Sequence, residues 1–281
     1  MALAAAAAFE LPKINITCSA LVVDHGLQSD SERVASKAIE NLRALGISAK
    51  STRVKVRPSG SGLEAAARDA RYKALRQHKE AIGATAILLA HNLNDQAETV
   101  LLGLTRGSGL RSISGMRVID GDLVRPFLAI PKAELEQACR DAGIEFWQDP
   151  HNQDPSFTRV RIRQLLPTLE KELGPGIVQA LARSADLAQE ADDFLSVAAA
   201  DLIQDQNPAA GVQIQLFDIH PALRRKALQL LALRAGAREV SRAQVLLMEG
   251  LITDWHGQKP LRLSGITVER VSQVLRFHKP Q

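Results

Sequence analysis

The stretch TAILLAHNLNDQAET, residues 85–99, decides how we interpret the fold. Its first six residues form a short continuous apolar run, which is typical of a strand covered on both faces of a parallel sheet. The run ends at His91-Asn92, and a helical pattern begins directly after it. A second apolar run, ALVV at residues 20–23, likewise ends in Asp24-His25-Gly26. Both stretches predict a buried strand that carries polar residues at its carboxyl end.

Helical patterns lie between these two strands. Residues 31–45 place apolar side chains at helical spacing, and Gly46 suits the position just after a helix end. Residues 63–78 are rich in Ala, Arg and Leu, which favour helix, while residues 53–56 predict a weaker strand. The alternation predicts a doubly wound α/β domain with a mainly parallel, Rossmann-like sheet. In such a domain, ligands bind beyond the carboxyl ends of the strands.

The character of the sequence changes after Pro167. An amphipathic pattern and a capping-box signature at Ser241 and Gln244 predict helices there, and strand-like pieces surround Gly265. The expected helices cover residues 176–204, 221–234 and 241–253, after an earlier one at residues 131–142. We therefore expect an α/β domain at residues 1–167 and a smaller, mainly helical domain at residues 168–281.

Composition narrows the class of protein. A chain of 281 residues suggests two domains, and 46% hydrophobic with 23% charged residues is normal for a soluble globular protein. No apolar run approaches the roughly 20 residues that a membrane span requires. The two cysteines, Cys18 and Cys139, stand far apart, which argues against a disulfide, zinc or iron–sulfur framework and favours the cytoplasm. The net charge of +4 permits a polyanionic partner but does not identify one.

Acidic residues follow the strand at residues 85–90. Helical spacing places His91, Asp95 and Glu98 on one face, at the edge of the sheet where ligands bind. Two neighbouring carboxylates can hold an ammonium group or a divalent ion. A capped, solvated helix start explains the same residues, because acidic side chains stabilise helix N-termini. The spacing leaves both interpretations open.

Several arginines are candidates for contacting phosphate. Arg68 and Arg71 are neighbours on a predicted helix, with Tyr72 beside them to stack on a base. Taken alone, the segment fits better as an ordinary solvated helix. Arg106 precedes a Gly-Ser-Gly turn that suits a tight bend or a close approach to a nucleotide. The SGSG segment at residues 59–62 fits a connector better than a phosphate cradle.

A basic, alternating segment lies at the expected domain junction. Arg159, Arg161 and Arg163 alternate there with apolar residues and could track a nucleic-acid backbone. An edge strand or a helix start with solvated arginines is the alternative. No complete Walker A motif, Rossmann glycine fingerprint, H-E-x-x-H motif or G-x-S-x-G motif is present in the sequence.

Taken together, six blocks resemble the tRNA(Ile)-lysidine synthetases, a family of N-type ATP pyrophosphatases with an adenine-nucleotide α-hydrolase type of fold. The resemblance is strong over residues 1–167 and looser beyond. In order, the blocks are VVDHGL at 22–27, EAAAR with ARY at 64–72, HNLNDQAET at 91–99, RGSG with GM at 106–116, RPFL at 125–128, and DPHN with FTR at 149–159. Any one block is weak evidence, but six in this order are specific.

The resemblance implies an activity. Members of this family adenylate C2 of cytidine 34 in a tRNA(Ile) with a CAU anticodon, and the ε-amine of free L-lysine then displaces AMP to give lysidine. The implied cofactors are ATP and Mg²⁺. The implied partners are the tRNA and lysine, without a membrane.

The resemblance also implies site residues. Asp24, His25 and His91 are expected at the nucleotide, while Asp95 and Glu98 are expected to hold the charged groups of lysine or to organise magnesium. The arginines expected at the cytidine, its phosphates or the adenylate are Arg68, Arg71 and Arg106. Those expected on the tRNA are Arg159, Arg161 and Arg163. No residue is assigned as a direct metal ligand.

Three departures from the family pattern bear on these expectations. An S-G-G-x-D-S phosphate loop normally precedes an Ala-rich helix whose start resembles Met1–Ala4, so we expect the first strand and this loop to lie outside the sequence. Gln28 replaces a frequent Arg, and Val160 replaces a frequent Asn. The chain also ends before the further C-terminal domain of some relatives. We expect an enzyme whose activity as given is doubtful, with a non-catalytic tRNA-binding remnant as the alternative. A cytidine-thiolating relative is a third interpretation, but the cysteine pairs of those enzymes are not found here.

Overall fold

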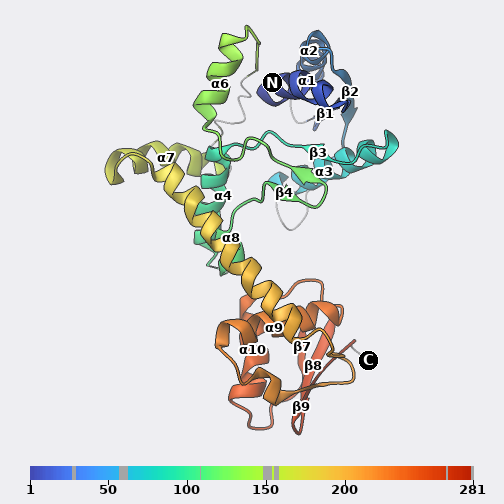
Figure 1. Ribbon diagram of the computed structural model, residues 1–281, viewed down its shortest axis with the longest axis vertical. Coiled ribbons are helices and arrows are strands. Elements are labelled where there is room, and N and C mark those ends of the chain that lie inside the picture. Colours follow the sequence, from blue (N-terminus) through green and yellow to red (C-terminus); the bar gives the residue numbers. More distant parts are fainter. Residues whose placement is uncertain are drawn as a thin grey trace. The chain divides into compact units, whose positions relative to one another are not determined.

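The structure is a computed structural model of the chain, which forms two compact units (Figure 1). The first comprises Met1–Leu102 with Met116–Ala182, and the second comprises Gly103–Gly115 with Arg183–Gln281. We describe each unit by itself. The residues that the structure describes are 1–26, 30–56, 63–107, 109–147, 154, 158–263 and 265–279.

The first unit contains parallel strands in two small sheets. β1 (Ser19–Asp24) pairs in parallel with β2 (Ser48–Arg53), and β3 (Ile87–Leu88) pairs in parallel with β5 (Leu123–Val124). β4 (Ile119–Asp120) adds to β5 in the antiparallel direction. In the described part of the chain, no strand joins β1 to β3. The parallel pairs confirm the predicted α/β class.

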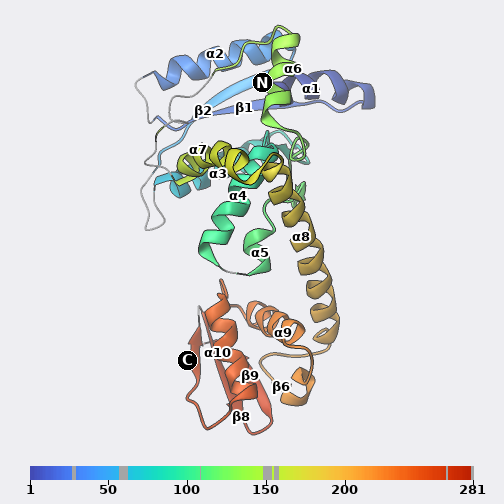
Figure 2. The same ribbon diagram turned by 90° about the vertical axis from the view of Figure 1, so that its left-hand side faces the viewer.

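Helices cover these strands. An apolar cluster packs α1 and α2 against β1 and β2, and α2 lies along this strand pair in Figure 2. α3 contacts both β1 and β3, so it bridges the two small sheets. A separate cluster packs α4 against α7 and the start of α8. The helices that begin in this unit are α1 (Ala2–Glu10), the 3-10 helix η1 (Leu11–Ile14), α2 (Ser31–Ala44), α3 (Leu63–Ala81), α4 (Leu93–Arg106), α6 (Lys132–Asp141), α7 (Thr158–Leu173) and α8 (Ile177–Leu202).

The second unit combines helices with an antiparallel sheet in the order β6-β9-β8-β7. Its core is fully buried at Phe217, Leu228, Met248 and Phe277. α10 contacts β7 and β8 and so covers one part of this sheet. The elements are α5 (Leu110–Ile113), β6 (Val212–Gln213), the 3-10 helix η3 (Ile214–Phe217), α9 (Pro221–Arg234), α10 (Arg242–Thr253), β7 (Leu261–Leu263), β8 (Ile266–Val271) and β9 (Val274–His278).

Most predicted elements are confirmed, and the differences have physical reasons. The capping box of Ser241 and Gln244 is present. The weak strand expected at residues 53–56 lies instead at Ser48–Arg53, where Ala49 is the one buried residue, so the strand carries little apolar signal. The arginine-rich segment forms the start of α7 rather than an edge strand. Pro167, the expected boundary, lies inside α7, and the compact units divide later, within α8.

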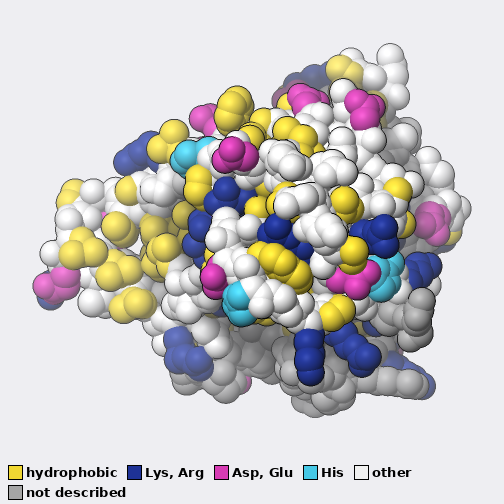
Figure 3. Space-filling view, turned by 90° about the horizontal axis from the view of Figure 1, so that it is seen from below, with side chains coloured by type: hydrophobic (Ala, Val, Ile, Leu, Met, Phe, Trp, Pro, Cys, Tyr) yellow, Lys and Arg dark blue, Asp and Glu magenta, His cyan; other side chains and the backbone are white. Residues whose placement is uncertain are grey.

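Two surface properties complete the description. None of the described helices is both long and apolar enough to span a bilayer. On the face shown in Figure 3, Lys and Arg side chains are interspersed with apolar and uncharged ones. The basic side chains on this face are therefore separated by apolar and uncharged ones.

Candidate active site

The loop after β1 is organised around Asp24. Its Oδ1 accepts a hydrogen bond from the backbone N–H of Gly26 at 2.8 Å, and Arg53 Nε lies 3.8 Å from its Oδ2. The Gly26 bond is the main cause that lowers the pKa of Asp24, so the carboxylate is ionised at neutral pH. Gly26 adopts φ +62°, and a Cβ there would stand 2.9 Å from Arg53 Nε. Glycine is therefore needed for the tight turn that carries Asp24 and His25.

His25 follows Asp24 and lies partly buried beside the charge of Arg71. Burial first, and then that positive charge, lower the pKa of His25, so its imidazole is neutral at pH 7. The Nδ1 atom of His25 is buried and has no hydrogen-bond partner in the described part of the chain. A buried polar atom without a partner is rare in a folded protein and suggests a site for a ligand.

His91 lies between β3 and α4, where the positive charge of several arginines acts on it. Burial and these positive charges lower the pKa of His91 to about 4, which keeps the ring neutral near pH 7. Its Nδ1 is also buried, and no described residue forms a hydrogen bond with it. Because α4 begins only at Leu93, helical spacing does not place His91 on the face of Asp95 and Glu98. The arginines concerned are Arg125, Arg71, Arg68 and Arg159.

Arg68 and Arg71 extend from α3 beside the ring of Tyr72. Their guanidinium carbons lie 5.1 and 5.6 Å from the ring centroid, and Arg68 Nη2 donates a hydrogen bond to the Tyr72 hydroxyl at 3.3 Å. Tyr72 is buried in an apolar cluster with Ile87 and Leu89. The expectation that Tyr72 is available to stack on a base is therefore wrong, because its ring belongs to the core and supports the two arginines.

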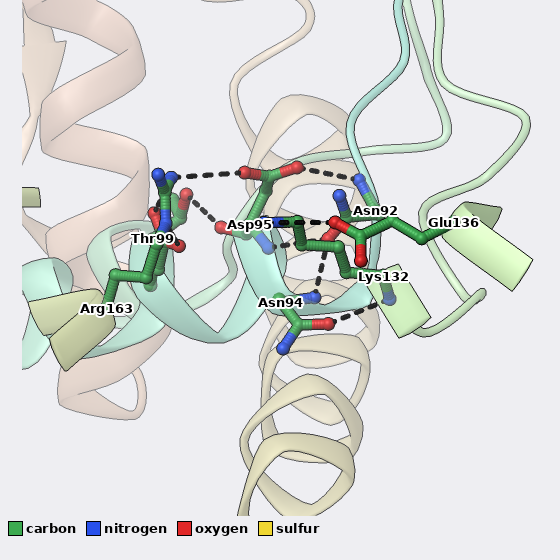
Figure 4. A network of polar contacts seen from close by, with 8 residues as sticks. Asn92, Asn94, Asp95, Thr99, Lys132, Glu136 and Arg163 are labelled. Carbon is green, nitrogen blue, oxygen red and sulfur yellow. Dashed lines mark hydrogen bonds and ion pairs between the residues drawn. The ribbon is translucent and has the colours of Figure 1, made fainter. Parts of the chain in front are cut away.

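The start of α4 is a network of caps, shown in Figure 4. Asn92 Oδ1 accepts hydrogen bonds from the backbone N–H groups of Asn94 at 2.9 Å and Asp95 at 3.2 Å. In return, Asp95 Oδ2 accepts one from the backbone N–H of Asn92 at 2.9 Å. Asp95 thus serves as part of a capped helix start, yet its side chain remains 22% exposed and can still meet a ligand.

Glu98 lies one turn further along α4 and is occupied by Arg163 of α7. Arg163 Nε donates to Glu98 Oε1 at 2.7 Å, and Arg163 Nη2 donates to Oε2 at 3.1 Å. The side chain of Glu98 is only 1% exposed, and this burial raises the pKa of Glu98, while the bonds from Arg163 oppose the rise. The same guanidinium stands 3.9 Å from Asp95 Oδ1. The structure therefore brings the two predicted carboxylates together around a cation of the protein itself.

This arrangement does not fit a magnesium site. Both oxygens of Glu98 accept bonds from Arg163, so they are not open to a metal ion. Among the described residues, no group of three or more His, Cys, Asp or Glu side chains is placed to bind a metal. Glu98 and Asp95 therefore do not form a magnesium site by themselves.

The remaining predicted residues separate into two sets. Arg159 acts on the pKa values of His91 and Arg71, so it lies near the arginine group, whereas Arg161 is exposed and donates to Thr158 Oγ1 at 3.0 Å. Arg106 is exposed and belongs to the second unit. Val160 is buried on the inner side of α7. The segments at residues 27–29, 57–62, 108, 148–153 and 155–157, which include several quoted motifs, lie outside the described residues.

A separate hollow in the second unit is lined by five basic side chains and two acidic ones. Lys226 pairs with Asp192 at 2.7 Å and Arg225 pairs with Glu249 at 2.7 Å, so part of this charge is neutralised. The four buried side-chain nitrogens without partners in the described structure all lie in the first unit, which places the candidate active site there. The charged lining residues are Arg111, Arg225, Lys226, Arg238, Arg242, Asp192 and Glu239.

Sequence reasoning missed Arg125 as a site residue. It directly follows β5 and is only 3% exposed. β5 is a two-residue strand, too short for its apolar pattern to be recognised, so nothing marked Arg125 as standing at a strand end. The RPFL block quoted above did contain it.

The α/β order agrees with a match of residues 1–169 to the family model of the PP-loop domain, which defines the class of protein. The similarity extends over nearly the whole chain. The tRNA(Ile)-lysidine synthase of Leifsonia xyli subsp. xyli is 46% identical over 99% of this chain and 86% of that protein. The one of Streptomyces coelicolor is 44% identical over 96% of this chain and 79% of that protein. The chain belongs to the tRNA(Ile)-lysidine synthase family.

A solved structure has a similar fold. The U34-tRNA thiolase NcsA from Methanococcus maripaludis, solved with its 4Fe-4S cluster, matches with a TM-score of 0.50. The match covers 62% of this chain and 63% of that chain at 17% identity, which is a likeness in fold alone. The named relatives do not favour the alternative of a non-catalytic tRNA-binding remnant.

Proposed function

We propose that the protein is an ATP-dependent carbon–nitrogen ligase acting on tRNA(Ile). It joins L-lysine to C2 of cytidine 34 in a CAU anticodon through an adenylated intermediate, with release of AMP and pyrophosphate. The observation that carries this proposal is the set of buried, unpartnered nitrogens on His25, Arg71, His91 and Arg125. Three of these residues follow strands β1, β3 and β5, where nucleotides bind in α/β domains. Membership of the family supplies the particular reaction.

The charges of the site suit this chemistry. Adenylation releases a polyphosphate, whose negative charge arginines at the strand ends stabilise. His25 and His91 are neutral near pH 7, so each ring carries one N–H that can donate to a nucleotide. ATP is the cofactor that these donors would hold, with Asp24 at the same edge of β1. Magnesium, implied by the resemblance, would need ligands beyond Glu98 and Asp95.

In this proposal, Asp95 binds the lysine substrate. Asp95 is partly exposed, whereas Glu98 is buried and bound to Arg163. A carboxylate that is reachable and held by its own backbone contacts can pair with the lysine ammonium group. Glu98 then holds Arg163, and through it α7, in place beside Asp95.

ATP turnover also requires a phosphate loop. Such a loop aims several backbone amides at the phosphates from a helix N-terminus. No S-G-G-x-D-S sequence occurs in the 281 residues. A polypeptide of these residues alone should therefore have little ATP-dependent activity. A further parallel strand leading into such a loop could pair with β1 and β3, which no described strand joins.

The tRNA surface is proposed from the basic residues. Arg68 and Arg71 lie in the N-terminal half of α3, and Arg159 and Arg161 lie in the first turn of α7. A sequence pI near 9.2 is consistent with a polyanionic partner. Arg106 and Arg163 remain candidates, Arg163 with the reservation that it is paired with Glu98. Thiolation of cytidine is disfavoured, because Cys18 and Cys139 are the sole cysteines of the sequence and form no pair suited to sulfur chemistry.

The test is an assay of AMP and pyrophosphate release with ATP, lysine and a tRNA(Ile) transcript carrying CAU. It is run on the 281-residue chain and on the same chain joined to a strand and S-G-G-x-D-S loop. The proposal expects release by the joined chain that depends on both lysine and tRNA. Release that is independent of lysine would contradict it.

A further inference from the structure

Arg125 is a buried charge for which the described residues provide no counter-ion within hydrogen-bond distance. Three charged side chains are buried among the described residues: Glu98, Arg125 and Glu249. Glu98 is bound by Arg163 at 2.7 Å, and Glu249 is bound by two arginines at 2.7 and 2.9 Å. Among the described residues, the acidic group nearest to Arg125 is Asp120, at 3.9 Å, which is beyond hydrogen-bond distance and itself 62% exposed. A buried charge without a partner is strongly unfavourable, so this position suggests a function other than stability.

The hydrogen bonds of Arg125 leave one side of its guanidinium free. Nη1 donates to the backbone carbonyl of Arg117 at 2.7 Å, which fixes the orientation of the group. Nε is buried and has no hydrogen-bond partner among the residues that the structure describes. An arginine nitrogen can only donate, so the missing partner must be an acceptor.

Arg125 belongs to a cluster of such donors. It follows β5, and His91 follows the neighbouring parallel strand β3, where Leu89 N donates to Val124 O at 2.8 Å. His91 Nδ1 and Arg71 Nε are likewise buried and unpartnered. Tyr72, next to Arg71 on α3, packs with Leu89 and Leu123 of the β3–β5 region, so Arg71 lies on the helix that covers these strands. Positive charge from both Arg71 and Arg125 contributes to the lowered pKa of His91. The cluster thus offers two guanidinium groups and an imidazole, with unpartnered nitrogens turned away from solvent.

We propose that Arg125 is a phosphate-binding residue of this site, acting together with Arg71. An oxyanion with several acceptor oxygens satisfies unpartnered donors on two arginines at once, and guanidinium groups match the geometry of phosphate. The inference rests on the proposed function only for the origin of the phosphate. The chemistry is shared by the phosphates of the nucleotide and by the backbone phosphate beside the target cytidine.

The test measures the affinity of the 281-residue chain for three probes: inorganic pyrophosphate, AMP, and an RNA stem-loop with a CAU anticodon. The variants are Arg125→Gln, Arg125→Lys and Arg71→Gln. Lys73→Gln is the matched control, because Lys73 is exposed on the same helix as Arg71. Loss of a charge-assisted bond should weaken binding of at least one probe about tenfold or more in Arg125→Gln and Arg71→Gln. Arg125→Lys, which keeps the charge but not the planar fork, should weaken it less, and Lys73→Gln should bind normally.

The three probes distinguish whether the bound phosphate belongs to the nucleotide or to the RNA backbone. Weaker binding of pyrophosphate and AMP with an unchanged stem-loop assigns Arg125 to the nucleotide, and the reverse assigns it to the RNA backbone. If Arg125→Gln does not fold, Arg125→Lys and Arg71→Gln decide the outcome. Variants that keep wild-type affinity for every probe, or a wild-type chain that binds none, overturn the inference. If the same variants, placed in the chain joined to the phosphate loop, still allow normal lysidine formation, the inference fails while the proposed function stands.

Discussion

Removal of Arg163 should destabilise the first unit strongly, because it leaves Glu98 buried without its partner. The Arg163→Met change keeps most of the side-chain volume and deletes the guanidinium that joins α4 to α7 across 65 positions of sequence. Breaking a buried ion pair from one side typically costs about 3–5 kcal/mol. Arg163 is itself 34% exposed, so water can reach the gap, and we expect the lower end, about 3 kcal/mol. That is a large share of the roughly 5–15 kcal/mol by which a domain is stable.

The pH dependence of this loss follows from the pKa of Glu98. Burial already raises this pKa, and without Arg163 it should rise further above its unfolded value. A carboxyl group whose pKa is raised on folding binds its proton more tightly in the folded state. The contribution of Glu98 to stability is then lost as the pH rises through the folded pKa. Arg163→Met should therefore be less damaging at pH 5 than at pH 8.

Urea titrations of the unfolding of the first unit, at both pH values, test this reasoning. The set includes wild type, Arg163→Met, Glu98→Gln and the double variant, with Arg161→Met as the control for an exposed arginine on the same helix. The double variant should recover part of the loss, because it contains no unpaired buried charge. A cost below about 1 kcal/mol for Arg163→Met at pH 8, equal to that of Arg161→Met, would refute the buried pair.

Four further predictions follow from the site. His91→Asn should flatten the pH dependence of stability between about 4 and 6.5. Because folding lowers the pKa of His91 to about 4, the neutral ring contributes to the stability of the folded state. This contribution is complete above the pKa of His91 in the unfolded chain and is lost as the pH falls toward about 4, and it amounts to at most roughly 3 kcal/mol. Thermal unfolding across that pH range measures it. Binding of tRNA should weaken steeply with salt, and Arg159→Gln should reduce the slope of log affinity against log salt by about one; a salt-independent affinity would count against the proposed surface. Asp95→Asn, tested in a chain joined to the phosphate loop, should impair lysine-dependent turnover by about 2–5 kcal/mol, and an unchanged lysine dependence would remove this assignment. The 281-residue chain alone should release little AMP, and turnover comparable with that of the joined chain would show that the loop is dispensable.

Local patterns in the sequence were sufficient for the strand ends and for most helices. The apolar run before His91 and the one before Asp24 each predict a strand and the edge at which it ends, although the residues of β1 are only partly buried. α9 begins and ends as predicted, at Pro221 and Arg234, because proline at the first turn and a change in periodicity mark its limits. These features depend on neighbours in sequence, which a single chain displays.

Features that depend on contacts between residues far apart in the sequence were not predictable from local patterns. Helical spacing puts Tyr72 beside Arg71, but only the packing of α3 on β3 determines that its ring is buried against Ile87 and Leu89. The pairing of Glu98 with Arg163 joins elements with no common sequence signal. β2 is polar and β5 is two residues long, so neither has the alternation that identifies a strand. The site residue Arg125 was missed for that reason.

The most direct test of the account is the incorporation of labelled lysine into tRNA at nucleotide 34. The chain is joined to a strand and S-G-G-x-D-S loop and incubated with ATP, labelled L-lysine and tRNA(Ile) transcripts that differ only in carrying CAU or GAU anticodons. The account predicts label at position 34 of the CAU transcript, in amounts equal to the AMP released, and none in the GAU transcript. ATP-dependent AMP release without lysine in the CAU transcript, or equal labelling of both transcripts, would contradict it.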